Sequence, residues 1–213
     1  MKVLLYKELK LALHPSVLIF PLLGALLLIP SYPYFIAFCY VFIGFANTFM
    51  IGRGNQDILF SVSLPVRKRD IVKARFATFI VIELIHIVIA IPFAILGAKL
   101  NPQGNTVGMD GNYAFFGLLF IMYAIFNTIF LTKFYKTGYK IAMGMFLACT
   151  AVTLYIIAIE ISVHIFEPVK TLDTLSGHMT EQLIVLIGGI LIFILSNVFA
   201  YKISARNFEK VDL

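Results

Sequence analysis

Charged side chains are scarce in this chain of 213 residues. Only 13% of its residues are charged, whereas 61% are hydrophobic. In soluble domains about a quarter of the residues are charged and about 45–50% are apolar. A soluble protein of this size could not cover so much apolar surface. The deficit therefore excludes an ordinary soluble domain and indicates one all-α polytopic membrane domain.

Several motifs are also missing. No G-x-x-x-x-G-K-[ST] phosphate-binding loop occurs in the sequence. No nucleophile with a base and no metal triad falls at one expected depth, which argues against an intramembrane enzyme. Charges at Lys2, Lys7, Glu8 and Lys10 interrupt the first leucines, so we expect no removable signal peptide. The two cysteines are expected at different depths, as small apolar groups without a disulfide.

Six apolar stretches are present, and each is a candidate transmembrane helix, since about 20 such residues cross about 30 Å. They cover residues 17–29, 34–51, 76–96, 114–131, 141–165 and 183–201. Pro30 and Pro33 separate the first two and predict a tight turn, although one long bent helix remains an alternative. The domain then divides into residues 1–14, spans 15–51, a loop 52–75, spans 76–201 and a tail 202–213.

Basic residues give the direction of these spans. With a cytoplasmic N-terminus, all of the 17 Lys and Arg residues except Lys99 and Lys170 fall on the inner side. This asymmetry predicts an even number of spans, with both termini cytoplasmic. The inner charges are dispersed over four segments, so we expect contact with anionic lipid heads and no nucleic-acid partner.

The first fourteen residues have the pattern of an amphipathic interfacial helix. At 100° per residue, Lys7, Lys10 and His14 share one face, and the opposite face carries Leu5, Leu9, Ala12 and Leu13. A plain cytoplasmic extension of the first span is the alternative, which Pro15 disfavours.

The loop between the second and third spans is not featureless. Asn55 is expected to cap a helix over residues 55–64, with Asp57 in its first turn. Pro65 ends this helix. Its apolar side chains Ile58, Leu59 and Phe60 either seek a protein partner or fold back into the lipid interface.

The loop carries a resemblance. After the helix comes "LPVRKRDIVK" at residues 64–73, and the chain opens with "YKELKL" at residues 6–11. With the six spans, these runs resemble the permease subunits of type-2 ABC exporters. The size is similar to that of compact phenol-soluble-modulin and antimicrobial-peptide exporters. The resemblance makes residues 6–11 an elbow helix and residues 55–64 the coupling helix, whose contact residues are Asn55, Asp57, Ile58, Leu59, Phe60, Leu64, Pro65 and Arg67.

The same resemblance implies partners and a place in the cell. Two copies of a separate ABC ATPase would bind ATP and Mg²⁺, and this chain would hold no cofactor and no catalytic site. A second permease copy or a paralogue would pack against the first and fifth spans, and on the fifth Gly144 and Ala148 allow close approach. The implied function is export of amphipathic peptides across a bacterial plasma membrane.

Polar residues within the predicted spans are a further group of candidates, because such residues are costly in lipid. Asn47, Glu83, Asn127 and Asn197 fall in the inner third of four spans, and His86 shares a face with Glu83. They either form interhelical hydrogen bonds or line an inward-facing substrate pathway. A proton-coupled carrier that uses Glu83 is the alternative function.

A metal site is not expected. The two carboxylate–histidine pairs, Glu83 with His86 and Glu160 with His164, fall near opposite sides of the bilayer, so they cannot share an ion.

Overall fold

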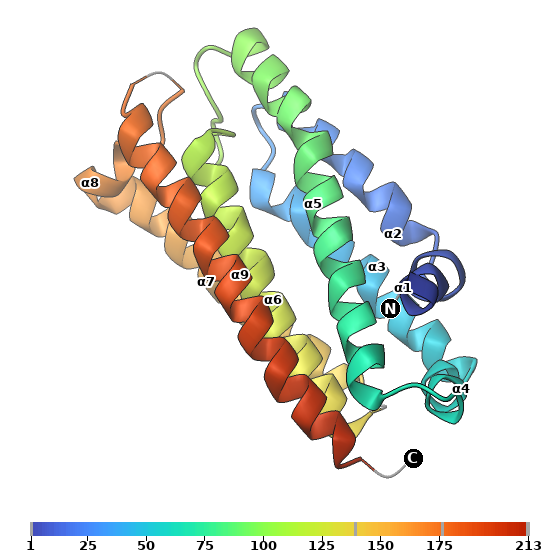
Figure 1. Ribbon diagram of the computed structural model, residues 1–213. Coiled ribbons are helices and arrows are strands. Elements are labelled where there is room, and N and C mark those ends of the chain that lie inside the picture. Colours follow the sequence, from blue (N-terminus) through green and yellow to red (C-terminus); the bar gives the residue numbers. More distant parts are fainter. Residues whose placement is uncertain (1, 139, 176, 212–213) are drawn as a thin grey trace.

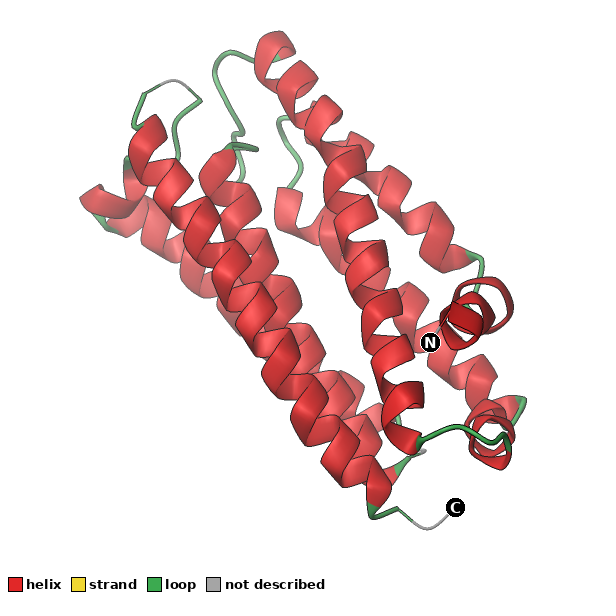
Figure 2. Cartoon of the chain, viewed as in Figure 1, coloured by secondary structure: helices red, strands yellow, loops and turns green. Residues whose placement is uncertain are grey.

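The computed structural model describes residues 2–138, 140–175 and 177–211, which form helices joined by loops, without a β-strand in these ranges (Figures 1 and 2). The first elements are α1 (Lys2–Lys7), the π-helical turn η1 (Glu8–Ala12), α2 (Ser16–Ile19) and the 3-10 helix η2 (Phe20–Leu28). They are followed by α3 (Tyr34–Gly54), α4 (Asp57–Ser63), α5 (Lys68–Leu100), α6 (Tyr113–Thr137), α7 (Ala142–Ile165), α8 (Glu167–Lys170) and α9 (Met179–Glu209).

Five of the helices in the described part of the chain, α3, α5, α6, α7 and α9, are long and apolar enough to cross a membrane. They cover the second to sixth predicted spans. The first predicted span corresponds to the shorter helical segment Ser16–Leu28. Nine of its residues form a 3-10 helix, so the segment is about 24 Å long against a hydrocarbon core of about 30 Å. A membrane crossing by this first segment, and with it the count of six spans, therefore stays a prediction.

Helix α5 begins well before residue 76, where the third span was expected to start. Arg67 is the N-cap residue of α5 and has an extended backbone. Asp70 lies in the first turn of α5, where a carboxylate is favoured. The irregular segment after α4 therefore ends at Arg67, and the last part of the predicted cytoplasmic segment, residues 52–75, already belongs to α5. Most of the basic run lies on the first turns of a helix that continues to Leu100.

The N-terminal helix packs on the protein with residues outside its predicted apolar face. Leu4 and Glu8, one turn apart, are buried in the protein, whereas Leu9 is exposed. The structure thus directs a carboxylate towards the other helices, and the contact of the leucine face with lipid stays a prediction. Figure 1 shows α1 lying across the bundle rather than along it.

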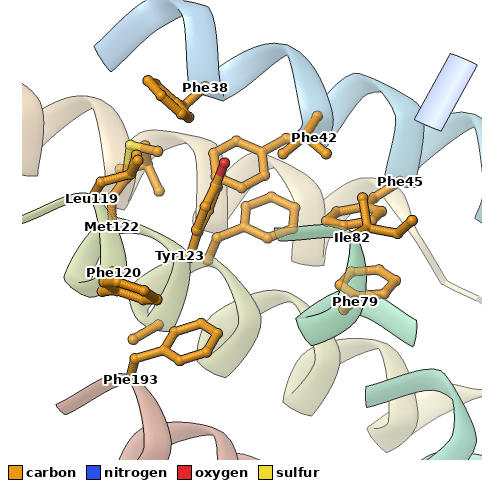
Figure 3. Close-up of a cluster of buried hydrophobic side chains, with 14 of the residues drawn as sticks. Phe38, Phe42, Phe45, Phe79, Ile82, Leu119, Phe120, Met122, Tyr123 and Phe193 are labelled. Atoms are coloured by element: carbon orange, nitrogen blue, oxygen red, sulfur yellow. The ribbon is translucent and has the colours of Figure 1, made fainter. Parts of the chain in front are cut away.

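The core is largely aromatic, as the content of 21 phenylalanines in the sequence allows. Phe45 of α3 stacks on Phe79 of α5 with ring centroids 3.7 Å apart, and Phe42 stacks on Phe126 of α6 at 3.8 Å. Figure 3 shows this cluster between α3, α5 and α6. Stacked rings bury a large area and hold the three helices together.

Glycine permits the closest crossing, between α6 and α9. A Cβ atom at Gly117 would lie 2.5 Å from the carbonyl oxygen of Val185, and one at Gly189 would overlap the carbonyl of Gly117. Both glycines have an ordinary helical backbone, so glycine is required here only because any side chain would prevent the close approach of the two helices. The two glycines were not singled out from the sequence.

The two ends of the bundle differ. At one end, α4 lies near the start of α5 and the end of α9, where Arg69 pairs with Glu209 at 2.5 Å (Figure 1). At the other end, α8 lies with the loop before α6. Both cysteines are free; Cys39 is half-buried and Cys149 is exposed, whereas two buried thiols were expected.

Candidate functional site

Helix α4 is positioned by a sharp reversal of the chain after α3. Asn55 continues the hydrogen bonding of α3, since its N–H donates to the carbonyl of Ile51 at 2.9 Å. Gln56 then adopts a left-handed conformation with φ of 53°, and α4 starts at Asp57. The expectation that Asn55 caps this helix is therefore wrong, because Asn55 is the C-cap of α3 and no side chain caps α4.

A buried ion network ties α4 to the rest of the protein. Arg75 of α5 lies between two carboxylates: its Nε atom is 2.6 Å from Glu8 Oε2, and its Nη2 atom donates to Asp57 Oδ2 at 2.8 Å. Arg75 and Glu8 are 4% and 2% exposed. The guanidinium also lies 4.9 Å from the ring centroid of Phe49 on α3. Burial makes each of these contacts stronger than its counterpart at a surface.

Lys7 completes the network. Its ammonium group forms an ion pair with the second oxygen of Asp57 and donates to Ser61 Oγ at 2.7 Å. Two cations thus face the two anions Glu8 and Asp57, and the network is neutral. Because its members come from α1, η1, α4 and α5, a displacement of α4 must move or break contacts with all of these elements.

The outer surface of α4 is apolar. Leu59 and Phe60 are 45% and 58% exposed, whereas Ile58 is half-buried and packs on the core. The predicted trio therefore divides into one anchoring residue and two exposed ones. An exposed pair of large apolar side chains on a short helix is a surface suited to a protein partner or to the lipid interface.

The remaining predicted coupling residues lie in the connection to α5. Leu64 is extended at the C-cap of α4, Pro65 is exposed, and Arg67 is exposed at the N-cap of α5. None of the ion pairs among the described residues involves Arg67. These residues shape the turn between α4 and α5 and do not join the network.

Three of the four polar residues predicted to form a layer within the bundle are brought together. Asn127 Nδ2 of α6 donates to Glu83 Oε2 of α5 at 2.9 Å and to Asn197 Oδ1 of α9 at 3.1 Å. All three side chains are buried. Glu83 Oε1 and Asn127 Oδ1 have no hydrogen-bond partner among the described residues. Asn47 is half-buried and lies outside this chain of hydrogen bonds.

His86 belongs to a neighbouring contact. Its Nδ1 atom is 3.0 Å from the hydroxyl of Tyr123, and its ring lies 4.5 Å from that of Phe38. Glu83, His86 and Asn127 are fully excluded from solvent in this conformation. They connect helices here, and their role as a substrate pathway stays a prediction.

Gly144 and Ala148, the predicted dimer contacts, face inward. A Cβ atom at Gly144 would lie 3.3 Å from the Lys133 side chain and 3.4 Å from Phe130, both on α6 of the same chain. Ala148 is fully buried. Neither residue is available to a second copy in this conformation, because the close approach that they permit is used within the chain.

Two carboxylates meet at the end of the bundle opposite α4. The backbone N–H of Asp110 donates to Asp173 Oδ1 at 2.7 Å, and Asp110 Oδ1 accepts from the N–H of Asn105 at 2.6 Å. Burial raises the pKa of both carboxyl groups; at Asp110 the Asn105 bond opposes the rise and the charge of Asp173 adds to it. No group of three His, Cys, Asp or Glu residues in the described ranges could hold a metal ion.

The ion network was missed from the sequence, although one signal was present. Arg75 falls on the same helical face as Ile71, Phe79 and Ile82, all buried, at spacings of three or four residues. A basic residue within such an apolar stripe must be paired when the stripe is buried. Its separation from Glu8 by 67 residues hides the partner.

Comparison with known proteins identifies the family. No curated protein and no solved structure matches the chain. The family model described as ABC-2 family transporter protein matches residues 3–209, which is nearly the whole chain. The protein thus belongs to the ABC-2 transporter family and is a membrane permease subunit of an ABC transporter.

Proposed function

We propose that this permease subunit exports amphipathic peptides from a bacterial cell by alternating access. It would cross the plasma membrane six times with α4 and both termini in the cytoplasm. The excess of basic residues on that side supports this direction. Two copies of a separate ATPase would bind ATP and Mg²⁺, and a second permease copy or paralogue would complete the pathway.

The observation that carries this proposal is the construction of α4. Its outer side presents Leu59 and Phe60 to a partner, and its first residue, Asp57, is held by Arg75 and Lys7. A push on the outer side therefore reaches α5 and the N-terminal helix through charges that are nearly excluded from water. Breaking such a buried pair is strongly unfavourable, so the elements are expected to move together.

The polar contacts within the bundle fit this mechanism. The hydrogen bonds of Asn127 link α5 with α6 and α9. Movement of α5 relative to α6 would separate Glu83 from Asn127 and expose both groups. The pathway for substrate is proposed to open at this contact.

The first experiment tests the partner. The tagged permease is purified after co-expression with a candidate ABC ATPase, and the ATPase is expected to co-purify. Phe60→Asp should remove it, because a charge replaces the exposed ring at the centre of the contact. Ser63→Asp, which adds the same charge at another exposed position of α4, is the control. Equal recovery of the ATPase with Phe60→Asp would contradict the proposal.

The second experiment tests the substrate. Vesicles that contain the complex are expected to accumulate a labelled amphipathic peptide when ATP is supplied on the α4 side. A soluble polar peptide of the same length is the control. Uptake that follows a proton gradient and does not require ATP would instead support the carrier based on Glu83.

A further inference from the structure

A cavity of about 270 Å³ lies between α4 and the ends of α3, α5 and α6. Its apolar wall consists of Phe49, Ile58, Leu59 and Phe134. Arg75 and Asp57 of the ion network and Leu59 of the exposed side of α4 border this space, but they do not fill it. It lies at the end of the bundle that carries α4 and opens beside that helix.

The charges around the cavity differ in their availability. Arg75 and Asp57 line it, but each already binds the other, and Arg75 also binds Glu8. Arg53 also lines the cavity, is exposed, and forms no ion pair with a carboxylate among the described residues. The cavity therefore combines an apolar wall with one cation that is available to a ligand.

From this combination, we infer that the cavity binds an anionic phospholipid, with an acyl chain against Phe49, Ile58 and Phe134 and the phosphate on Arg53. A volume of about 270 Å³ is far larger than one water molecule needs and has room for part of an acyl chain. A guanidinium is well suited to a phosphate group.

The surroundings favour a lipid over the proposed peptide cargo. The α4 end carries basic residues such as Arg67 and Lys73, which are exposed and attract an anionic membrane surface at about 1 kcal/mol each. A cationic amphipathic peptide would meet Arg53 with like charge. The inference uses the proposed function only for the assignment of this end to the cytoplasmic leaflet, where anionic lipids would reach it.

The test uses the absence of tryptophan from the chain. Leu59→Trp places a single indole in the cavity wall, and the purified permease is put into nanodiscs without any ATPase. Brominated phosphatidylglycerol is expected to quench the fluorescence of this indole more strongly than brominated phosphatidylcholine at the same mole fraction. Equal quenching by the two lipids would overturn the inference.

Two matched pairs of variants locate the site. Gly52 lines the cavity, and a Cβ atom there would meet only Asp57, at 3.7 Å, so Gly52→Leu should fill the space and abolish the difference between the lipids. Gly54→Leu, where a Cβ atom meets nothing within 4 Å, should preserve it. Arg53→Gln should raise the phosphatidylglycerol fraction for half-maximal quenching about tenfold, and Lys73→Gln should not.

A second measurement avoids the tryptophan substitution. Native mass spectrometry of the unmodified permease should show bound phosphatidylglycerol in preference to phosphatidylcholine, with the preference lost in Arg53→Gln. A preference that survives both Arg53→Gln and Gly52→Leu would overturn the inference. Because neither measurement includes an ATPase or a peptide, the result is independent of whether the proposed export occurs.

Discussion

Arg75 Nε and Glu8 Oε2 lie 2.6 Å apart, although 67 residues separate the two side chains in the sequence. Both are nearly excluded from solvent, and Asp57 of α4 occupies the other side of the same guanidinium. The contact joins the N-terminal helix to the helix proposed to receive the ATPase. The network is therefore the first target for mutation.

Replacing Arg75 with Gln should destabilise the protein and uncouple it. The substitution leaves Glu8 and Asp57 buried without their shared cation, which costs about 3–5 kcal/mol for a buried pair. Thermal unfolding in detergent measures the loss of stability. Peptide-stimulated ATP hydrolysis by the reconstituted complex measures coupling.

Lys73→Gln is the control, because Lys73 is an exposed cation on the same helix. Its unfolding temperature should match that of the unmodified protein. The double variant Glu8→Gln with Arg75→Gln should lose less than the sum of the single changes, since it removes both charges of one pair. Additive losses would mean that the two side chains act independently.

The crossing of α6 and α9 gives a second prediction. Gly189→Leu should prevent the close approach, because even a Cβ atom at this position overlaps the Gly117 backbone. Overpacking of this kind typically costs about 1–3 kcal/mol or more. Gly188→Leu should be tolerated, since a Cβ atom at Gly188 meets nothing within 4 Å. Yield of monodisperse protein and thermal unfolding distinguish the two variants.

These cases show what the sequence could and could not predict. Apolar run length located α3 and α7 to within a few residues, because a helix in lipid must satisfy its own backbone. The same criterion does not give the start of α5, since charged residues continue the helix outside the apolar run. The first apolar run, residues 17–29, is short for a crossing, and the structure forms a 3-10 helix there, η2, which rises more per residue than an α-helix.

Contacts between helices were harder to predict than the helices themselves. Small residues were recognised on α7, but Gly144 packs on α6 of the same chain, and the tightest crossing uses Gly117 and Gly189 instead. Spacing along one helix shows that a close approach is possible and does not identify the partner. The expected depth in the membrane was more informative. Counting residues from the basic side chains at the inner surface placed Glu83, Asn127 and Asn197 in one layer, and in the structure these three are hydrogen-bonded; Asn47, placed in the same layer, is not part of this contact.

The third prediction separates packing from function at Glu83. Glu83→Gln should retain the fold, because a Gln side-chain oxygen accepts the Asn127 bond as the carboxylate does. Asn127→Leu removes the donor that both Glu83 and Asn197 use, and an unsatisfied buried group costs about 1–3 kcal/mol. Thermal unfolding should therefore fall for Asn127→Leu and not for Glu83→Gln.

Transport by Glu83→Gln then tests the pathway. If Glu83 only connects helices, export by the variant should equal that of the unmodified complex. A selective loss of transport at unchanged stability and unchanged ATPase binding would instead assign Glu83 to the substrate pathway.

The carboxyl pair at the opposite end predicts a dependence on pH. Burial raises the pKa of Asp110 and Asp173 above the ordinary value of 3.8. The native state then holds more protons than the unfolded state between 3.8 and the raised pKa. The contribution of the pair to the free energy of unfolding therefore falls as pH rises through this interval.

Asp173→Asn removes one of these charges and keeps an oxygen to accept the Asp110 N–H. It should raise the free energy of unfolding relative to the unmodified protein at pH 7, and less so at pH 4. We expect about 0.5 kcal/mol, since solvent screens a half-buried group. Chemical unfolding at the two pH values measures this difference.

Glu160 Oε2 accepts from the N–H of Met109, and the His164 side chain contacts the Glu160 carbonyl, so both groups lie near the pair. Both interact with the Asp173 charge, Glu160 by repulsion and His164 by attraction, so the loss of these two interactions is part of the measured difference. Glu167→Gln is the control, because its carboxylate is at the same end with 87% of the side chain exposed. A Glu167→Gln effect as large as that of Asp173→Asn would show that net charge at this end, and not the buried pair, sets the pH dependence.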